Sequence, residues 1–258
     1  MADVLLEVCV EDPNGLAAAV TGGADRIELC SGLALGGLTP SDGLMAAAAT
    51  CPIPVYAMIR PRAGDFAYRD AEIDVMIDDI GAARRHGLQG VVFGAIDGGG
   101  RLHETQLRRL FRAAAGMGAT LHRAFDLLTC EVEEGVEQAV ALGFERILTS
   151  GRAPSAAQGL PALLRALARA SGRISIMPGG GLTPDMIARF LALAPASEIH
   201  ASCSAEAEEG DLRVRSFGFG RGMRRFTDER LVRRLKDAMR APGPAGAAHR
   251  MGIRDGGL

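Results

Sequence analysis

The stretch "TGGADRIEL" at residues 21–29 has the same form as "RHGLQGVVF" at 85–93 and "ALGFERILT" at 141–149. In each stretch a helical segment ends at glycine, and the chain then enters a short apolar run that favours a strand. Glycine closes helices because it adopts the left-handed backbone conformation without a steric penalty. The repetition predicts helices and strands in alternation, which is the pattern of an α/β protein with a parallel sheet.

Short β-forming runs occur eight times along the chain, with helical stretches between them. Eight is the number of strands that closes a barrel. An open doubly wound sheet is the rival, but the turn "EVCVEDPNG" at 7–15 lacks the glycine-rich fingerprint of that fold. We therefore predict a single TIM-like (β/α)8 barrel over residues 1–240. The predicted strands are Leu5–Val10, Arg26–Cys30, Val55–Arg60, Gly90–Ala95, Ala119–Asp126, Arg146–Ser150, Arg173–Met177 and Glu198–Ser202.

Two segments do not follow the repeat. Residues 205–226 are rich in charge, and we predict a long connection there between the eighth strand and the last helix. Residues 241–258 are rich in Gly, Ala and Pro, a composition that cannot bury enough apolar surface to order a chain. We predict that this tail is disordered.

The composition excludes several classes of partner. The chain has 258 residues, 48% of them apolar, a net charge of −2 and no Trp, so a nucleic acid partner is not expected. No run of about 18 apolar residues occurs, so no membrane span is predicted either. The N-terminal sequence lacks the pattern of a secretory signal, and we expect a cytoplasmic protein. Its five cysteines are then expected to be free thiols in a reducing compartment.

Polar side chains gather at the predicted strand ends. In a barrel these ends form the active face. Any one of these side chains alone is as easily read as a buried polar group with a satisfied hydrogen bond, but their recurrence on most strands predicts a cleft. Strand alternation places Glu7 with Cys9, Glu28 with Cys30, and His122 with Asp126 on common faces. The candidates for acid–base catalysis are Glu7, Glu28, His122, Asp126 and His200.

Positive groups accompany these candidates. Arginine binds carboxylate and phosphate groups with two parallel hydrogen bonds. The "PGGG" turn at 178–181 follows the seventh strand, where barrels often bind phosphate, although it is equally read as an ordinary tight turn. The candidates for anion binding are Arg60, Arg62, Arg123, Gly179, Gly180 and Gly181.

Cys9 and Cys30 lie in equivalent places in the first two strands, and we expect them about 4.8 Å apart on neighbouring strands. Two thiolates suit Cu(I), so a metal site of Cys9 and Cys30 is one hypothesis, and small apolar filling of the core is the other. Carboxylates are poor ligands for Cu(I). Glu7 and Glu28 are therefore expected to pair with Arg60, Arg62 or Arg123, or to act as acid and base.

The chain resembles the CutC family of copper homeostasis proteins. The resemblance rests on "LEVCV", "GGADRIELCSGL", "GGLTPS", "MIRPRAGDF", "GVVFGA", "LHRAFD", "GFERILTSG", "MPGGGL" and "EIHAS", in unbroken order over about residues 4–203. It implies a (β/α)8 barrel, a cytoplasmic location, a homo-oligomer (dimer or tetramer) and Cu(I) binding by Cys9 and Cys30. Where the family pattern reads "RPRGGDF", this chain has Ala63 in place of the first glycine of that pair.

Two functions follow from these observations. The first is copper homeostasis with Cu(I) bound by the thiol pair. The second is an enzyme that performs acid–base chemistry on a small anionic or phosphorylated metabolite, with copper binding adventitious. A scaffolding oligomer is a third reading, but it leaves the predicted cleft without a purpose. Whether the protein is an enzyme stays open at this stage.

Overall fold

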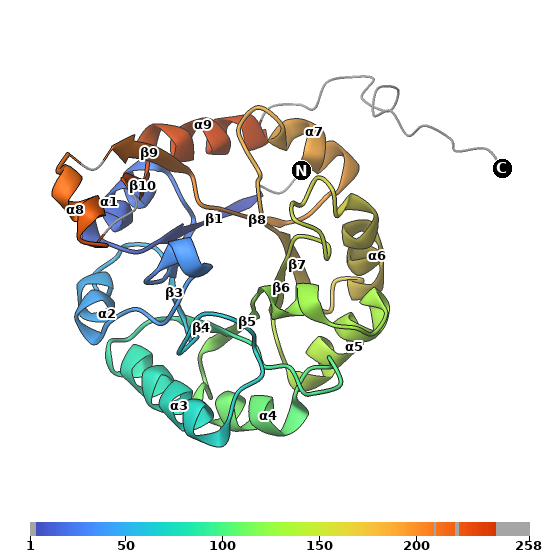
Figure 1. Ribbon diagram of the computed structural model, residues 1–258. Helices are drawn as coiled ribbons and strands as arrows, with labels where there is room; N and C mark the ends of the chain where they lie inside the picture. The colour runs from blue at the N-terminus through green and yellow to red at the C-terminus, as the bar shows by residue number, and fades with distance from the viewer. Residues whose placement is uncertain (1–3, 209, 220–221, 241–258) are drawn as a thin grey trace.

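Eight parallel strands surround the central axis of the computed structural model, which describes residues 4–208, 210–219 and 222–240 (Figure 1). Strand β1 pairs with β2 and with β8, and the pairing continues in sequence order to β7, which lies beside β8. The sheet is therefore a (β/α)8 barrel, as predicted. The strands are β1 (Leu5–Val10), β2 (Arg26–Leu29), β3 (Val55–Met58), β4 (Gly90–Phe93), β5 (Gly118–Leu121), β6 (Arg146–Thr149), β7 (Ser175–Pro178) and β8 (Glu198–Ala201).

Helices form the outer ring of the barrel (Figure 1). Two of the glycines in the repeated stretches, Gly23 and Gly143, have φ of 94° and 100° and close the helices before them. The prediction that these two glycines end helices in the left-handed conformation is therefore confirmed. The helices are α1 (Pro13–Gly22), α2 (Asp42–Ala48), α3 (Asp70–Arg85), α4 (Glu104–Ala113), α5 (Val132–Leu142), α6 (Leu160–Ala170), α7 (Ile187–Leu193) and α9 (Glu229–Arg240). None of the helices in the described part of the chain has the length and apolar character that a membrane crossing needs.

The barrel interior contains buried charged side chains as well as a small apolar cluster. The main apolar core lies between the outer face of the strands and the helices, whereas a small inner cluster contains Tyr56, Met58 and Cys30. Near it, the buried guanidinium of Arg26 binds the carboxylates of Glu7 and Glu198. An ionic interior of this kind is costly to desolvate, so it depends on every charge having a partner.

Strand β5 is shorter than predicted. It ends at Leu121, and residues Arg123–Leu127 form a 3-10 helix instead of the last part of a strand. The side chain of His122 causes the turn, because its Nδ1 accepts a hydrogen bond from the backbone N–H of Ala124. The expectation that His122 and Asp126 share a strand face is therefore wrong.

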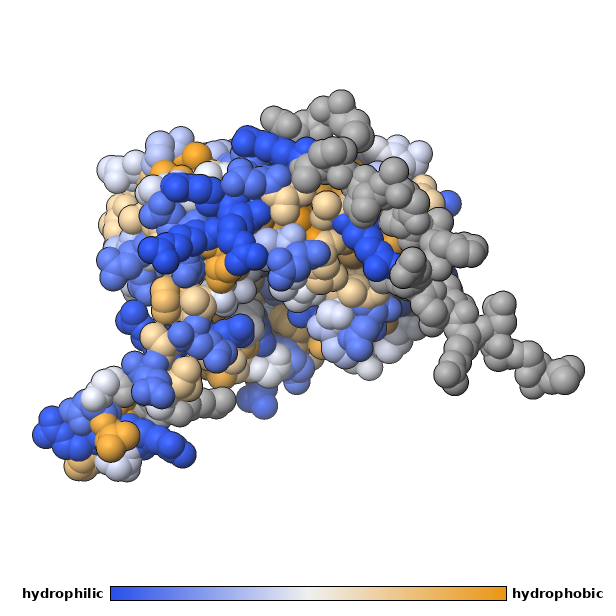
Figure 2. Space-filling model, turned by 90° about the horizontal axis from the view of Figure 1, so that it is seen from above, coloured by the Kyte–Doolittle hydropathy of each residue, from blue (hydrophilic) through white to orange (hydrophobic). Residues whose placement is uncertain are grey.

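The predicted charged connection at 205–226 contains regular structure. It holds β9 (Ser204–Glu208), the short helix α8 (Leu212–Ser216) and β10 (Met223–Thr227), and β9 pairs antiparallel with β10. Figures 1 and 2 show this arm, the hairpin with α8, extending away from the barrel at the left. Charged residues in alternation with small ones gave little strand signal, which is why pairing was not predicted. The predicted disordered tail at 241–258 lies outside the described residues.

Candidate metal and ligand site at the barrel mouth

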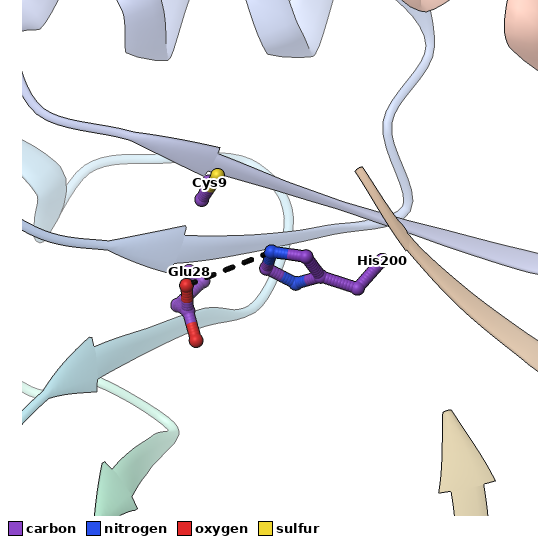
Figure 3. A group of neighbouring side chains, drawn as sticks. All are labelled: Cys9, Glu28 and His200. Atoms are coloured by element: carbon purple, nitrogen blue, oxygen red, sulfur yellow. Dashed lines mark ion pairs between the residues drawn. The ribbon is translucent and has the colours of Figure 1, made fainter. Parts of the chain in front are cut away.

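Three side chains from three adjacent strands meet inside the barrel mouth. Cys9 on β1, Glu28 on β2 and His200 on β8 each offer a ligand atom, and these atoms lie within 4.8 Å of one another (Figure 3). All three residues are buried. A thiol, a carboxylate and an imidazole that converge in this way form a potential metal site, and they are also a set of groups able to exchange protons.

The pairing of β1 with β2 decides which groups meet. Cys9 is opposite Glu28, while Val10 is opposite Leu29, so Cys30 lies beyond the end of the paired segment. The expectation that Cys9 and Cys30 occupy corresponding places on the two strands is therefore wrong. The Sγ of Cys30 lies 3.5 Å from Oε2 of Glu28, and its neighbours include Met58 in the inner apolar cluster. As metal ligands together, Cys9 and Cys30 remain a prediction.

Glu7 fixes the orientation of His200. One oxygen of the Glu7 carboxylate, Oε1, lies 2.8 Å from Nδ1 of His200, and the other accepts from Nε of Arg26. The second ring nitrogen of His200, Nε2, is therefore directed towards the cluster, where it lies 3.8 Å from Oε2 of Glu28 (Figure 3). A histidine held through one nitrogen by a carboxylate presents the other nitrogen to a metal or a proton.

The carboxylates pair differently from what the sequence suggested. Glu7 binds Arg26 and His200, and Glu28 faces His200 and Cys30. Neither pairs with the arginines expected, because the aligned strands place Glu7 directly beside both Arg26 and His200. Sequence reasoning missed Arg26. The available signal was strand alternation, which puts Arg26 on the same face as Glu28 two positions later.

The electrostatics of the cluster couple these groups. Burial raises the pKa of Glu7, but the hydrogen bond from His200 and the charge of Arg26 outweigh it and lower that pKa to about 2. Burial lowers the pKa of His200, but Glu28, Cys9 and Glu7 outweigh it and raise that pKa well above its usual value. Burial also raises the pKa of Glu28, and burial next to Glu28 raises the pKa of Cys30. These shifts favour the ionised form of Glu7 and the protonated forms of His200, Glu28 and Cys30.

A pocket of about 170 Å³ adjoins the cluster, and we call it the mouth pocket. His122 has a lowered pKa of about 3, first because it is buried and then because Arg60 lies near it. An imidazole with this pKa is neutral at physiological pH. The polar residues that line the mouth pocket are Cys9, Glu28, Arg60, His122, Arg123 and His200. One cavity is thus lined by the metal candidate Cys9 and by five of the residues that were predicted for acid–base catalysis or anion binding.

A second cavity of about 460 Å³ shares Cys9, Arg123 and His200 with the mouth pocket. Arg123, Gly180 and Gly181 contribute to its wall, so part of the predicted anion site lies here. Gly179 serves packing, because its N–H donates to the Thr149 carbonyl and a Cβ would press on a neighbouring leucine.

Two predicted site residues are engaged elsewhere. The guanidinium of Arg62 binds Glu72 and Asp65, and Arg62 lines neither mouth cavity. The carboxylate of Asp126 accepts from Thr149 Oγ1 at 2.5 Å, from the backbone of Ser150 and from Nε of Arg123. Asp126 therefore organises the loop after β6, and it also holds Arg123 at the rim.

Comparisons with known proteins agree with this architecture. A CutC family protein of Rhizobium meliloti is 54% identical over 242 residues, which are 94% of this chain and 98% of that protein. A crystal structure of a CutC protein from Streptococcus agalactiae, whose name refers to copper homeostasis, is 30% identical, with a TM-score of 0.73, and covers 77% of this chain and 98% of that one. Phosphoribosyl anthranilate isomerase from Thermococcus kodakaraensis shares the fold alone, at 15% identity and a TM-score of 0.56, over 92% of this chain and 99% of that one. The CutC family matches residues 4–205, and the chain belongs to that family.

Proposed function

We propose that this protein serves copper homeostasis by binding Cu(I) at the barrel mouth, with Cys9 as one ligand. The observation that supports this most is the convergence of Cys9 Sγ and a ring nitrogen of His200, within 4.8 Å, beside a carboxylate. The hydrogen bond from His200 to Glu7 gives the imidazole the support that metal-bound histidines usually have.

The donor set fits a soft ion. Zinc–sulfur and zinc–nitrogen bonds are about 2.3 and 2.0 Å long, and at similar lengths for copper a sulfur and a nitrogen on one ion lie at most about 4.3 Å apart. The spacing within the cluster requires only a small adjustment to reach this limit. Thiolate and imidazole both suit copper, whereas a carboxylate does not suit Cu(I). We assign Glu28 the part of a charge partner for the bound cation.

The second soft donor is His200 or Cys30. The geometry favours His200, because its nitrogen belongs to the cluster around Cys9, while Cys30 Sγ contacts Glu28 and lies beyond the paired segment. The thiol pair predicted from the sequence is the alternative. Both arrangements share Cys9, so they differ only in the effect of replacing the second donor.

A Cu(I) titration of the reduced protein against a competing chelator tests the proposal. The variants are Cys9→Ser, Cys30→Ser and His200→Asn. We expect one ion per chain in the native protein, loss of binding in Cys9→Ser and His200→Asn, and retention in Cys30→Ser. Loss in Cys30→Ser with retention in His200→Asn identifies the thiol pair instead. Native binding weaker than the chelator, or unaffected by Cys9→Ser, contradicts the copper proposal.

The second candidate function is acid–base catalysis on a small anionic or phosphorylated metabolite, with copper binding adventitious. One observation favours it: Glu7, His200 and Cys9 are ordered as an orienting carboxylate, an imidazole and a thiol, beside a cavity lined by Arg123. Inorganic phosphate is a suitable probe for that cavity. We expect Arg123→Ala to weaken phosphate binding to the metal-free protein, and unchanged binding contradicts an anion site at this position.

We further propose a cytoplasmic homo-oligomer, as the family resemblance implied. The five cysteines are free, which suits a reducing compartment. The arm exposes Leu212, Phe217 and Phe219 to 83%, 72% and 83%, and large apolar side chains exposed together often mark a contact surface. A second copy of the chain is the proposed occupant. Sedimentation equilibrium of the Phe217→Ser/Phe219→Ser variant tests this, and an unchanged mass contradicts a role for the arm in assembly.

A further inference from the structure

The second cavity, of about 460 Å³, has the size of a small-molecule site. It shares Cys9, Arg123 and His200 with the mouth pocket, so these residues belong to both cavities. Arg225 and Arg234 line the second cavity alone. A ligand in the second cavity therefore has access to the proton-exchanging groups of the site and also to two arginines that the mouth pocket lacks.

The arginines of the second cavity come from three separate elements. Arg123 belongs to the 3-10 helix after β5, Arg225 to β10 of the arm, and Arg234 to α9. Their side chains are 44%, 67% and 60% exposed, so a dissolved ligand can reach them. Asp185 is the only carboxylate among the described residues that line the cavity. Three positive charges therefore face one negative charge in this wall.

The carboxylate partners of Arg225 and Arg234 are weak competitors for a ligand. Nε of Arg225 lies 3.5 Å from Oε1 of Glu206, and Nη2 of Arg234 lies 3.2 Å from Oδ1 of Asp185. Both carboxylates are exposed, and an exposed ion pair contributes only about 0–1 kcal/mol. Because a guanidinium has five N–H donors, each pair leaves donors for a second partner. A phosphate that accepts two parallel hydrogen bonds can therefore displace or join either carboxylate.

Arg123 is held more firmly than the other two arginines. Its Nε donates to Oδ2 of Asp126 at 2.8 Å, and its Nη2 donates to Oγ of Ser150 at 2.6 Å. Its Nη1 lies beside Gly180, a residue of the cavity wall, since a Cβ added to that glycine would be 3.8 Å away from it. Arg123 thus provides a fixed donor in the wall, where Nη1 is not occupied by either of these two partners.

The periodicity of α9 explains why Arg234 faces the cavity. Leu231, Arg234 and Leu235 all line it, and residues three or four apart share one face of a helix. Arg233 lines neither cavity, and its Nη2 donates instead to the carbonyl of Thr21. Arg233 is therefore a matched control for Arg234, because it carries the same charge on the same helix and lies outside the cavity.

We propose that the second cavity binds a phosphate monoester of a short carbon chain, with its phosphate between Arg225 and Arg234 and its chain extending to Arg123. A phosphate monoester carries close to two negative charges at neutral pH and three acceptor oxygens, which suits two guanidinium groups better than a carboxylate does. The cavity has the liquid volume of about fifteen water molecules, which leaves room for a few carbons beside the phosphate. The inference rests on the second candidate function, names its ligand class and adds Arg225 and Arg234 to its site.

Calorimetric titration of the metal-free protein with glycerol 3-phosphate tests the inference. Inorganic phosphate lacks the carbon chain and glycerol lacks the phosphate, so both serve as matched probes. We expect saturable binding of glycerol 3-phosphate, weaker binding of inorganic phosphate and no binding of glycerol. Absence of saturable glycerol 3-phosphate binding overturns the inference. Equal affinity for inorganic phosphate also overturns it, because the ligand is then free phosphate and not a monoester.

Single substitutions locate the phosphate. Arg225→Gln and Arg234→Gln are each expected to weaken glycerol 3-phosphate binding about tenfold or more, as the loss of a hydrogen bond to a charged group predicts. Arg224→Gln and Arg233→Gln are the controls, because neither residue lines the cavity and successive residues of a strand face opposite sides. Both controls should bind like the native protein. Asp185→Asn removes the carboxylate from the wall and is expected to bind more tightly.

The pattern across the variants separates this inference from the second candidate function. Native affinity in both Arg225→Gln and Arg234→Gln overturns the inference, and so does an equal loss in the two controls, because general charge attraction then explains the binding. If Arg123→Ala alone weakens binding, the anion site at Arg123 stands without the inference. If Arg225→Gln and Arg234→Gln weaken it while Arg123→Ala does not, the phosphate position is supported and the anion site at Arg123 is contradicted.

Discussion

Replacing Glu7 with glutamine tests how the cluster is oriented. The Glu7 carboxylate accepts from Arg26 through one oxygen and from His200 Nδ1 through the other. Glutamine has the same shape but only one acceptor oxygen. If that oxygen keeps Arg26, the amide N–H₂ faces Nδ1 of His200, so the neutral ring that metal binding requires carries its proton on Nε2 instead of Nδ1. That nitrogen is the one directed towards Cys9 and Glu28, so it is no longer free to bind a metal.

Two magnitudes follow from these contacts. Loss of a carboxylate that orients a metal-bound histidine typically weakens metal binding by about 10- to 100-fold, or roughly 1.4–2.7 kcal/mol. Removal of one partner from a buried ion pair costs about 3–5 kcal/mol of folding stability. Here we expect about 3 kcal/mol, because Arg26 retains its second carboxylate partner, Glu198.

Glu198→Gln is the matched control for Glu7→Gln. Glu198 also binds Arg26, and it binds Nε of Arg146 at 2.5 Å, but no hydrogen bond joins it to His200. Both variants should therefore lose stability in urea unfolding, while only Glu7→Gln should weaken Cu(I) binding in the chelator competition. Cu(I) binding at native affinity in Glu7→Gln refutes the reasoning. An equal loss in Glu198→Gln also refutes it, because the effect then comes from the buried charge and not from His200.

Three further outcomes are expected. Because the pKa of His122 is about 3 when folded and about 6.5 when unfolded, the unfolded chain takes up a proton first as the pH falls. The contribution of His122 to stability is therefore complete above pH 6.5 and is lost between pH 6.5 and 3 by up to about 1.4 kcal/mol per pH unit. The free energy of unfolding, measured in urea across this pH range, should depend less steeply on pH in His122→Asn than in the native protein. An equal pH dependence in the two proteins contradicts the assignment. Gly90→Ala should destabilise the barrel by about 1–3 kcal/mol, because a Cβ there overlaps the Tyr56 ring. An unchanged melting temperature in calorimetry contradicts this prediction and shows that the ring moves aside. Gly43→Ala, in a helix with open space around it, should instead leave stability unchanged or raise it by up to about 1 kcal/mol, and a loss of stability there would count against the surroundings described.

The fold is largely readable from the chain because its signals are local. A glycine that ends a helix and an apolar run that follows it depend only on neighbouring residues, and Gly23 and Gly143 adopt the conformation that the sequence predicted. Eight such strands leave few alternatives to a barrel. The end of β5 was missed, because the turn depends on a side chain, His122, that bonds its own backbone in competition with the strand.

The sequence by itself determined the barrel and the gathering of Cys9, Glu28 and His200 at its mouth, since every parallel strand of a barrel ends at the same face. Only the tertiary structure decided which groups touch. The register of β1 against β2 places Cys9 beside Glu28, and not beside Cys30. Register in a parallel pair is set by packing and long crossover connections, which no local pattern records. The partners of each charge, such as Arg26 for Glu7, follow from that register.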